Sequence, residues 1–141
     1  MAVLFFNEDT KLNLKGKRLL KKWIKESVYN EEKTLGNINF IFTSDKYLLE
    51  INNKYLSHNY LTDIVTFDYC ENNIVNGDIY ISIETVKNNS YRFNVTYLEE
   101  LRRVIIHGVL HLIGYSDSDE KEKKEMREKE DFYLALLKNL S

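Results

Sequence analysis

The chain has 141 residues, and its 20 basic and 22 acidic side chains leave a net charge of −2. This length predicts one domain over residues 1–141, and a hydrophobic content of 43% is enough for a core. No apolar run approaches the roughly 20 residues that span a bilayer, the first residues do not resemble a signal peptide, and the single cysteine, Cys70, excludes an internal disulfide framework. We therefore expect a cytoplasmic protein without a membrane partner.

The charges are distributed unevenly along the chain. Residues 11–25 carry seven basic side chains and no acid, whereas residues 116–131 carry eight acids and five bases. The overall charge argues mildly against a nucleic-acid binder, and we expect no DNA partner. A local basic face can nevertheless steer a polyanion towards a protein. Taken alone, the basic segment is best interpreted as the solvated face of a helix.

Hydrophobic periodicity and turn residues predict nine elements. In chain order these are a strand over 2–6, a helix over 16–29, a strand over 38–43, a helix from the cap Ser44 to about Tyr55, strands over 62–70 and 77–83, and helices over about 84–92, 97–113 and 119–139. The order β-α-β-α-β-β-α-α-α predicts an α+β fold, in which helices pack on a small, mostly mixed sheet of about four strands.

The last two helices carry the clearest end signals. Thr96 and Glu99 form a capping box at the start of the first of them, and Gly114 is placed to end it in a left-handed conformation. Ser118 or Asp117 is expected to cap the second. The side chains expected to face inward from that last helix are Met126, Phe132, Tyr133 and Leu136.

Two of the three histidines lie in the most apolar stretch of the chain. His107 and His111 are four residues apart, so both imidazoles lie on one face of the helix over 97–113. This is the spacing of the two metal ligands in H-E-x-x-H enzymes. Asp117 follows Gly114 closely enough for the chain to turn back towards them. Two imidazoles and a carboxylate suit one Zn²⁺ with an open fourth position, so we favour a metal site on this central helix over two satisfied core histidines.

The residue after the first histidine separates two kinds of hydrolase. A zinc peptidase needs a glutamate there as general base, but this chain has Gly108. Hydrolysis must then rely on the metal or on a base from elsewhere, as in phosphodiester cleavage.

The segment "HGVLHLIGYSD" resembles the signature of the YbeY family of bacterial endoribonucleases, H-G-x-L-H-L-x-G-Y-D-H. The match runs without gaps to Tyr115 and then departs: Ser116 stands where the family usually has Asp, and Asp117 where it has a third His. Upstream, "INNKYLSHNYLTDIVTFDY" is similar to the family's L-N-x-x-Y-R…T-D-V-L-S-F segment, and "NGDIYIS" to its G-D-I strand.

The resemblance implies a cytoplasmic, single-strand-specific endoribonuclease with one zinc ion. Its partners would be ribosomal RNA and the small ribosomal subunit, and its roles would be maturation of the 3′ end of the small-subunit RNA and ribosome quality control. The implied metal ligands, and through the metal the catalytic residues, are His107, His111 and Asp117. The family's RNA-facing arginine corresponds to Leu56, which His58 can partly replace.

Four further side chains are candidates for substrate or supporting roles: Asp63, His58, Arg102 and Arg103. Each also has an ordinary structural interpretation, as a turn or cap residue for Asp63 and as an ion-pair partner for the arginines. Two other functions stay open. One is a ribosome-assembly factor that binds RNA and holds a structural metal, and the less favoured one is a zinc peptidase that lacks the usual glutamate.

Overall fold

The computed structural model describes residues 1–57 and 62–141. Its elements follow the predicted order, and their bounds are β1 Ala2–Asn7, α1 Lys17–Asn30, β2 Thr34–Thr43, α2 Asp45–Leu56, β3 Ile64–Asp68, β4 Ile74–Ser82, α3 Ile83–Arg92, α4 Tyr97–Ile113 and α5 Glu120–Leu140. The predicted α+β class is confirmed. None of the helices described has the length and apolar character needed to cross a membrane.

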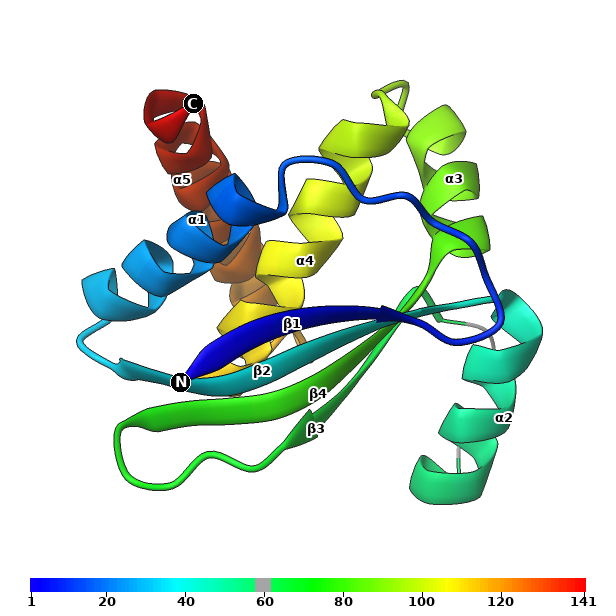
Figure 1. The fold of residues 1–141 in the computed structure, drawn as a ribbon, viewed down its shortest axis with the longest axis horizontal. Coiled ribbons are helices and arrows are strands. Elements are labelled where there is room, and N and C mark those ends of the chain that lie inside the picture. The colour runs from blue at the N-terminus through cyan, green and yellow to red at the C-terminus, as the bar shows by residue number, and fades with distance from the viewer. Residues whose placement is uncertain (58–61) are drawn as a thin grey trace.

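The four strands form one mixed sheet in the order β1-β2-β4-β3. β1 and β2 are parallel, as are β2 and β4, and β3 runs antiparallel to β4. Figure 1 shows α1, α4 and α5 stacked over one face of this sheet, with α2 beside the end of β3 and β4. The predicted small mixed sheet of four strands is therefore confirmed.

Helix α4 lies in the middle of the protein. Its residues are apolar on most sides, and it packs against β3, β4, α3 and α5. A helix that is hydrophobic nearly all round is stable only when neighbours cover it on several sides. The predicted capping box of Thr96 and Glu99 is present at its start, and Gly114 ends it with φ of 125°. Such a positive φ is readily adopted only by glycine.

Three strand boundaries differ from prediction. β2 begins at Thr34 rather than at 38. Thr34 and Leu35 pair with β4, and the pairing continues from Ile38 after an irregular register at Gly36 and Asn37. β4 likewise begins at Ile74 rather than at 77, since it pairs with the longer β2. β3 is shorter than the predicted strand over 62–70, and only Ile64–Asp68 pair with β4.

Two predictions about α5 are wrong. Its N-cap is Asp119, whose side chain accepts a hydrogen bond from the Glu122 N–H, and neither Ser118 nor Asp117 takes that place. Phe132 is predicted to face inward, but it is 55% exposed. The buried residues of α5 recur every three or four positions along one face, and Phe132 falls outside that series. The buried side chains of that face are Met126, Glu130, Tyr133 and Leu137.

Candidate metal centre

The two histidines of α4 face one another across one helical turn. Nε2 of His107 lies 2.9 Å from Nε2 of His111, and the two rings are nearly perpendicular. The imidazoles keep 21% and 24% of their surface exposed, although the residues on either side of them in α4 are mostly buried. The helix therefore presents two nitrogen donors at one accessible point.

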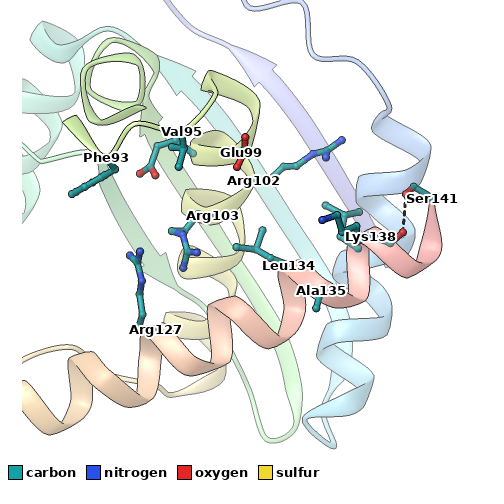
Figure 2. Close-up of a pocket in the computed structure, with 12 residues that line it drawn as sticks. Phe93, Val95, Glu99, Arg102, Arg103, Arg127, Leu134, Ala135, Lys138 and Ser141 are labelled. Atoms are coloured by element: carbon teal, nitrogen blue, oxygen red, sulfur yellow. Dashed lines mark hydrogen bonds between the residues drawn. The ribbon is translucent and has the colours of Figure 1, made fainter. Parts of the chain in front are cut away.

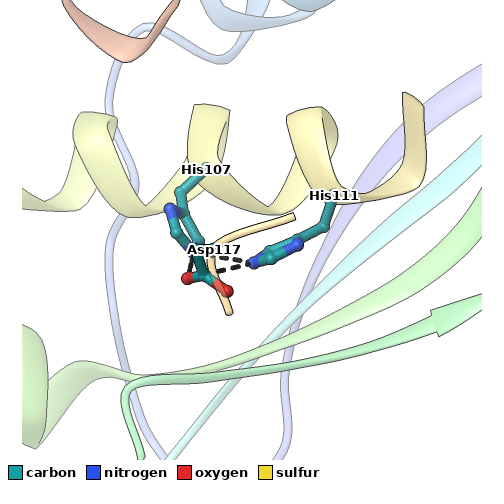
Figure 3. Close-up of side chains that lie close together, drawn as sticks. All are labelled: His107, His111 and Asp117. Carbon is teal, nitrogen blue, oxygen red and sulfur yellow. Dashed lines mark hydrogen bonds and ion pairs between the residues drawn. The ribbon is translucent and has the colours of Figure 1, made fainter. Parts of the chain in front are cut away.

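The third donor comes from the loop after α4. Oδ2 of Asp117 lies 3.3 Å from Nε2 of His107 and 3.6 Å from Nε2 of His111. Figure 3 shows the Asp117 carboxylate opposite both rings, carried there by the chain that turns back after Gly114. In a tetrahedral site with bonds of about 2.0–2.1 Å, donors are separated by about 3.3 Å. The three donor atoms are therefore spaced closely enough to hold a metal ion.

Each histidine is held through its other ring nitrogen. Nδ1 of His107 lies 2.6 Å from Oε2 of Glu130 on α5, and Nδ1 of His111 lies 3.0 Å from the backbone oxygen of Tyr115. Both oxygens are acceptors, so they favour the tautomer that carries the proton on Nδ1. Both Nε2 atoms are then left with a lone pair for the metal. Supporting contacts of this kind fix ring orientation and raise ligand basicity in metal sites.

The electrostatics of the two rings differ because of Glu130. Burial alone would lower the pKa of His107, but the hydrogen bond and charge of Glu130 outweigh it and raise that pKa. The pKa of His111 is lowered by burial and by the neighbouring His107. His107 is therefore the more basic of the two rings.

The loop that carries Asp117 is tied to two other helices by Glu31. The Tyr115 hydroxyl donates to Oε1 of Glu31 at 2.6 Å, and the Tyr133 hydroxyl donates to Oε2. Nζ of Lys129 lies 3.2 Å from the same carboxylate. Glu31, at the end of α1, thus contacts both α5 and the loop that follows α4. Its partner in that loop, Tyr115, lies two residues before the third donor, Asp117.

A groove of about 180 Å³ opens beside His111. It is lined by Asn52, Leu56, Thr62, Ile64, Val65, Thr66 and His111. This lining contains no lysine or arginine among the residues described, and Leu56, at the position of the family's arginine, is 39% exposed. His58 lies outside the described residues.

The other three candidates that the structure describes, Asp63, Arg103 and Arg102, have different surroundings. Asp63, just before β3, has a raised pKa because burial outweighs the nearby charge of His107. Arg103 makes ion pairs with Glu130 at 2.8 Å and with Asp131 at 2.7 Å, so it reaches His107 only through Glu130. Arg102 lines a different pocket, whose described residues include none of the three metal donors.

Sequence reasoning missed Glu130 and Glu31. Glu130 carries a signal that could have found it, since it recurs at helical spacing with Met126, Tyr133 and Leu137 and is therefore a carboxylate on a buried face. Glu31 carries no comparable signal, because its partners lie 84 and 102 residues away.

Comparisons with known proteins identify the family of the chain. A family model described as endoribonuclease YbeY matches residues 4–138. The endoribonuclease YbeY of Karelsulcia muelleri is 51% identical over 92% of each chain, and that of Bacteroides fragilis is 48% identical over 98% of this chain and 99% of its own. The solution structure of TM1509 from Thermotoga maritima superposes with a TM-score of 0.68 at 32% identity, over 96% of this chain and 89% of that one. The chain therefore belongs to the YbeY family of endoribonucleases.

Proposed function

We propose that this protein is a single-strand-specific endoribonuclease that holds one zinc ion on His107, His111 and Asp117. The observation that carries the proposal is the convergence of these three donors on one point in a chain of an endoribonuclease family. Two nitrogens and one carboxylate oxygen suit Zn²⁺ and leave a coordination position open. A divalent ion held there would supply Lewis acidity towards a phosphate oxygen and lower the pKa of a coordinated water.

The chain's own residues would prepare the site for this chemistry. Glu130 and the Tyr115 carbonyl hold the Nδ1 protons, so both Nε2 atoms are available as donors. The groove beside His111 would take the RNA, with the Thr62 and Thr66 hydroxyls along its wall. The raised pKa of Asp63 makes this carboxyl a candidate to take or give a proton.

A peptidase function is disfavoured by packing as well as by chemistry. A Cβ at Gly108 would lie 2.8 Å from Cδ1 of Ile64 and 2.9 Å from Cγ2 of Ile79. The position faces β3 and β4 rather than the metal centre, so a glutamate there could not act as the general base. Gly108 lets α4 lie close to Ile64 of β3 and Ile79 of β4.

In the cell, we propose that the protein acts in the cytoplasm on ribosomal RNA of the small subunit. Its roles there would be maturation of the 3′ end and ribosome quality control. These roles rest on the family membership and not on a feature of the site.

The test is cleavage of a labelled single-stranded RNA by zinc-loaded protein, with the matching duplex and casein as other substrates. The single strand should be cut, the duplex and casein should stay intact, and His107→Ala should abolish cleavage. Analysis of product ends then identifies the nucleophile, because a 2′,3′-cyclic phosphate requires the RNA's own 2′-hydroxyl and a 5′-phosphate requires water. RNA binding without turnover would instead support an assembly factor with a structural metal, and metal-dependent cleavage of casein would reverse the proposal.

A further inference from the structure

A second pocket lies between α4 and α5, away from the three metal donors. Its volume is about 400 Å³, and Figure 2 shows basic side chains distributed along it. Arg103 and Arg127 occupy one part, and Arg102 extends towards the end formed by Lys138 and the C-terminal residue Ser141. None of the three metal donors lines this pocket.

Arg102 has an unmet hydrogen-bonding requirement. Its Nε atom is buried and has no hydrogen-bond partner among the residues described. A buried donor without an acceptor loses its hydration without compensation, so native proteins rarely leave one. The guanidinium makes no ion pair with any described carboxylate, the chain terminus included. Arg102 therefore has a buried donor without an acceptor and a charge without an ion pair among the described residues.

Among the cations that line the pocket, only Arg103 makes ion pairs with described residues. The Glu99 carboxylate accepts the Thr96 N–H in the capping box of α4. Burial raises the pKa of Glu100 and the charges of Arg103 and Arg127 oppose that rise, but neither acid makes an ion pair in the described part of the chain. Glu130 and Asp131 both pair with Arg103. Arg127 and Lys138 make no ion pair in the described part of the chain. Positive charge is thus available at both ends of the pocket.

The rest of the wall is apolar and partly open. Phe93 is 50% exposed, with the guanidinium of Arg92 5.6 Å from the centre of its ring, and Val95 is 37% exposed. Leu134 of α5 lies between the two basic parts. An exposed aromatic ring offers a stacking surface for a base, and such stacking tolerates any base. A ligand that spans the pocket needs an anionic group that accepts from a guanidinium and a planar group that reaches Phe93 on the Arg103–Arg127 side.

We propose that the α4–α5 pocket binds a phosphate ester of a nucleoside, separately from the metal centre. The guanidinium fork of Arg102 matches phosphate oxygens in a bidentate manner, which a lysine could not do. The choice of a nucleotide over another anion rests on the proposed function, since the RNA substrate and its products carry this chemistry. A free mononucleotide and a nucleotide within an RNA strand are the two sources of such a group.

The test measures binding without cleavage, in the full chain carrying His107→Ala. AMP and a short single-stranded oligonucleotide are the two probes, followed by NMR at the arginine Nε–H groups and at the Ala135 methyl, which lines the pocket. Arg102→Gln and Arg127→Gln should each weaken binding by about tenfold or more, the loss expected for a charge-assisted hydrogen bond. Lys124→Gln, an exposed residue of α5 outside the pocket, is the matched control and should change nothing.

A further variant, Ala135→Glu, keeps the test decisive if an arginine variant fails to fold. It adds a negative charge at an exposed pocket residue and should also reduce affinity. Saturable binding of both probes, or of the oligonucleotide alone, supports the pocket and identifies the source of the phosphate. Equal affinity in all variants, shifts confined to the groove beside His111, or no saturable binding of either probe overturns it. RNA cleavage by the wild type is scored separately, so failure of the nuclease proposal stays distinct from failure of this one.

Discussion

The Glu130 carboxylate joins a metal-site histidine to a cation on the same helix. Its Oε2 lies 2.6 Å from Nδ1 of His107, and its Oε1 lies 2.8 Å from Nη1 of Arg103. One carboxylate on α5 therefore sets both the orientation and the pKa of a ring on α4. Arg103 pairs with the Glu130 carboxylate at a position where Glu130 is only 5% exposed, so the buried acid is not left without a partner.

Replacing Glu130 should weaken the metal site without removing a ligand. Glu130→Gln replaces the charged acceptor opposite His107 with a neutral amide, so we expect metal affinity to fall by roughly 10–100-fold. The pKa of His107 should also fall, since Glu130 is what raises it. Competitive chelator titration and an NMR titration of the imidazole measure the two effects. Glu128→Gln, an exposed neighbour on the same helix, is the control, and equal affinity in both variants would refute the role of Glu130.

Asp117 and Asp119 should differ sharply although they are two residues apart. Asp117→Ala should strip or loosen the metal, whereas Asp119→Ala should keep it and lose about 1 kcal/mol of stability through the missing N-cap bond. Asp117→His should keep the metal. It should also shift the activity–pH profile to lower pH, because a site with one less negative charge leaves the ion a stronger Lewis acid. Metal analysis, thermal unfolding and pH–rate profiles test the three variants. Metal lost from Asp119→Ala and retained in Asp117→Ala would reverse the ligand assignment.

Glu31 should make the protein sensitive to acid. Burial alone would raise its pKa, but hydrogen bonds from Tyr115, Tyr133 and Lys129 lower it below the ordinary 4.5. A folded-state pKa below the unfolded one contributes stability that is present above about pH 4.5 and is lost as the pH falls through the folded value. Glu31→Gln should therefore reduce stability at neutral pH by roughly 1–3 kcal/mol and flatten the acid dependence of the unfolding free energy.

Tyr133 provides a direct readout of the Glu31 contact. Burial and the hydrogen bond to Glu31 raise the pKa of Tyr133 to about 12. In Glu31→Gln this pKa should move towards the ordinary value of 10, as measured by NMR titration of the tyrosine rings. Glu32→Gln, at the exposed neighbouring position, should leave both the pKa and the acid stability unchanged. A wild-type acid profile in Glu31→Gln would show that the contact does not form in solution.

A side chain at position 108 should destabilise the fold. An alanine Cβ would lie within 3.0 Å of Ile64 and Ile79, so Gly108→Ala should destabilise the protein by roughly 1–3 kcal/mol. Adding Ile64→Val removes one of the contacted methyl groups and should recover part of the loss, which gives a favourable coupling energy in a double-mutant cycle. Denaturant unfolding of the two single variants and the double variant measures it. Additive effects would mean that α4 shifts away from the sheet instead.

The salt dependence of RNA affinity tests whether the basic segment, residues 11–25, faces RNA or solvent. All seven of its cations are exposed, and none makes an ion pair with the described residues. If this face meets RNA, charge reversal of Lys21 and Lys22 should weaken binding and reduce the slope of affinity against salt by about 0.7 per lost phosphate contact. Charge reversal of Lys124 on α5 serves as the control. An unchanged slope would assign the face to solvent, which is our interpretation of the sequence.

Local features of the chain were predictable because their partners are close in sequence. The capping box of Thr96 and Glu99 and the shared face of His107 and His111 depend only on helical geometry, which repeats every 3.6 residues. The order of elements and the α+β class also follow from short-range periodicity. The β2 boundary was missed because its first residues are extended by pairing with β4 and not by their own preference.

What only the tertiary structure decided is how the site is supported. Glu130 meets His107 across 23 residues, and Glu31 meets Tyr115 across 84. The pocket that contains Arg102 is likewise formed by α4, α5 and the loop before α4, and their separate sequences give no sign of it. Helical spacing determines which ligands of one helix share a face. The charges that orient those ligands and shift their pKa values come from segments that meet only when the core brings α1, α4 and α5 together. Coulomb and hydrogen-bond energies depend on distance in space and not on separation along the chain, so the sequence alone does not reveal these contacts.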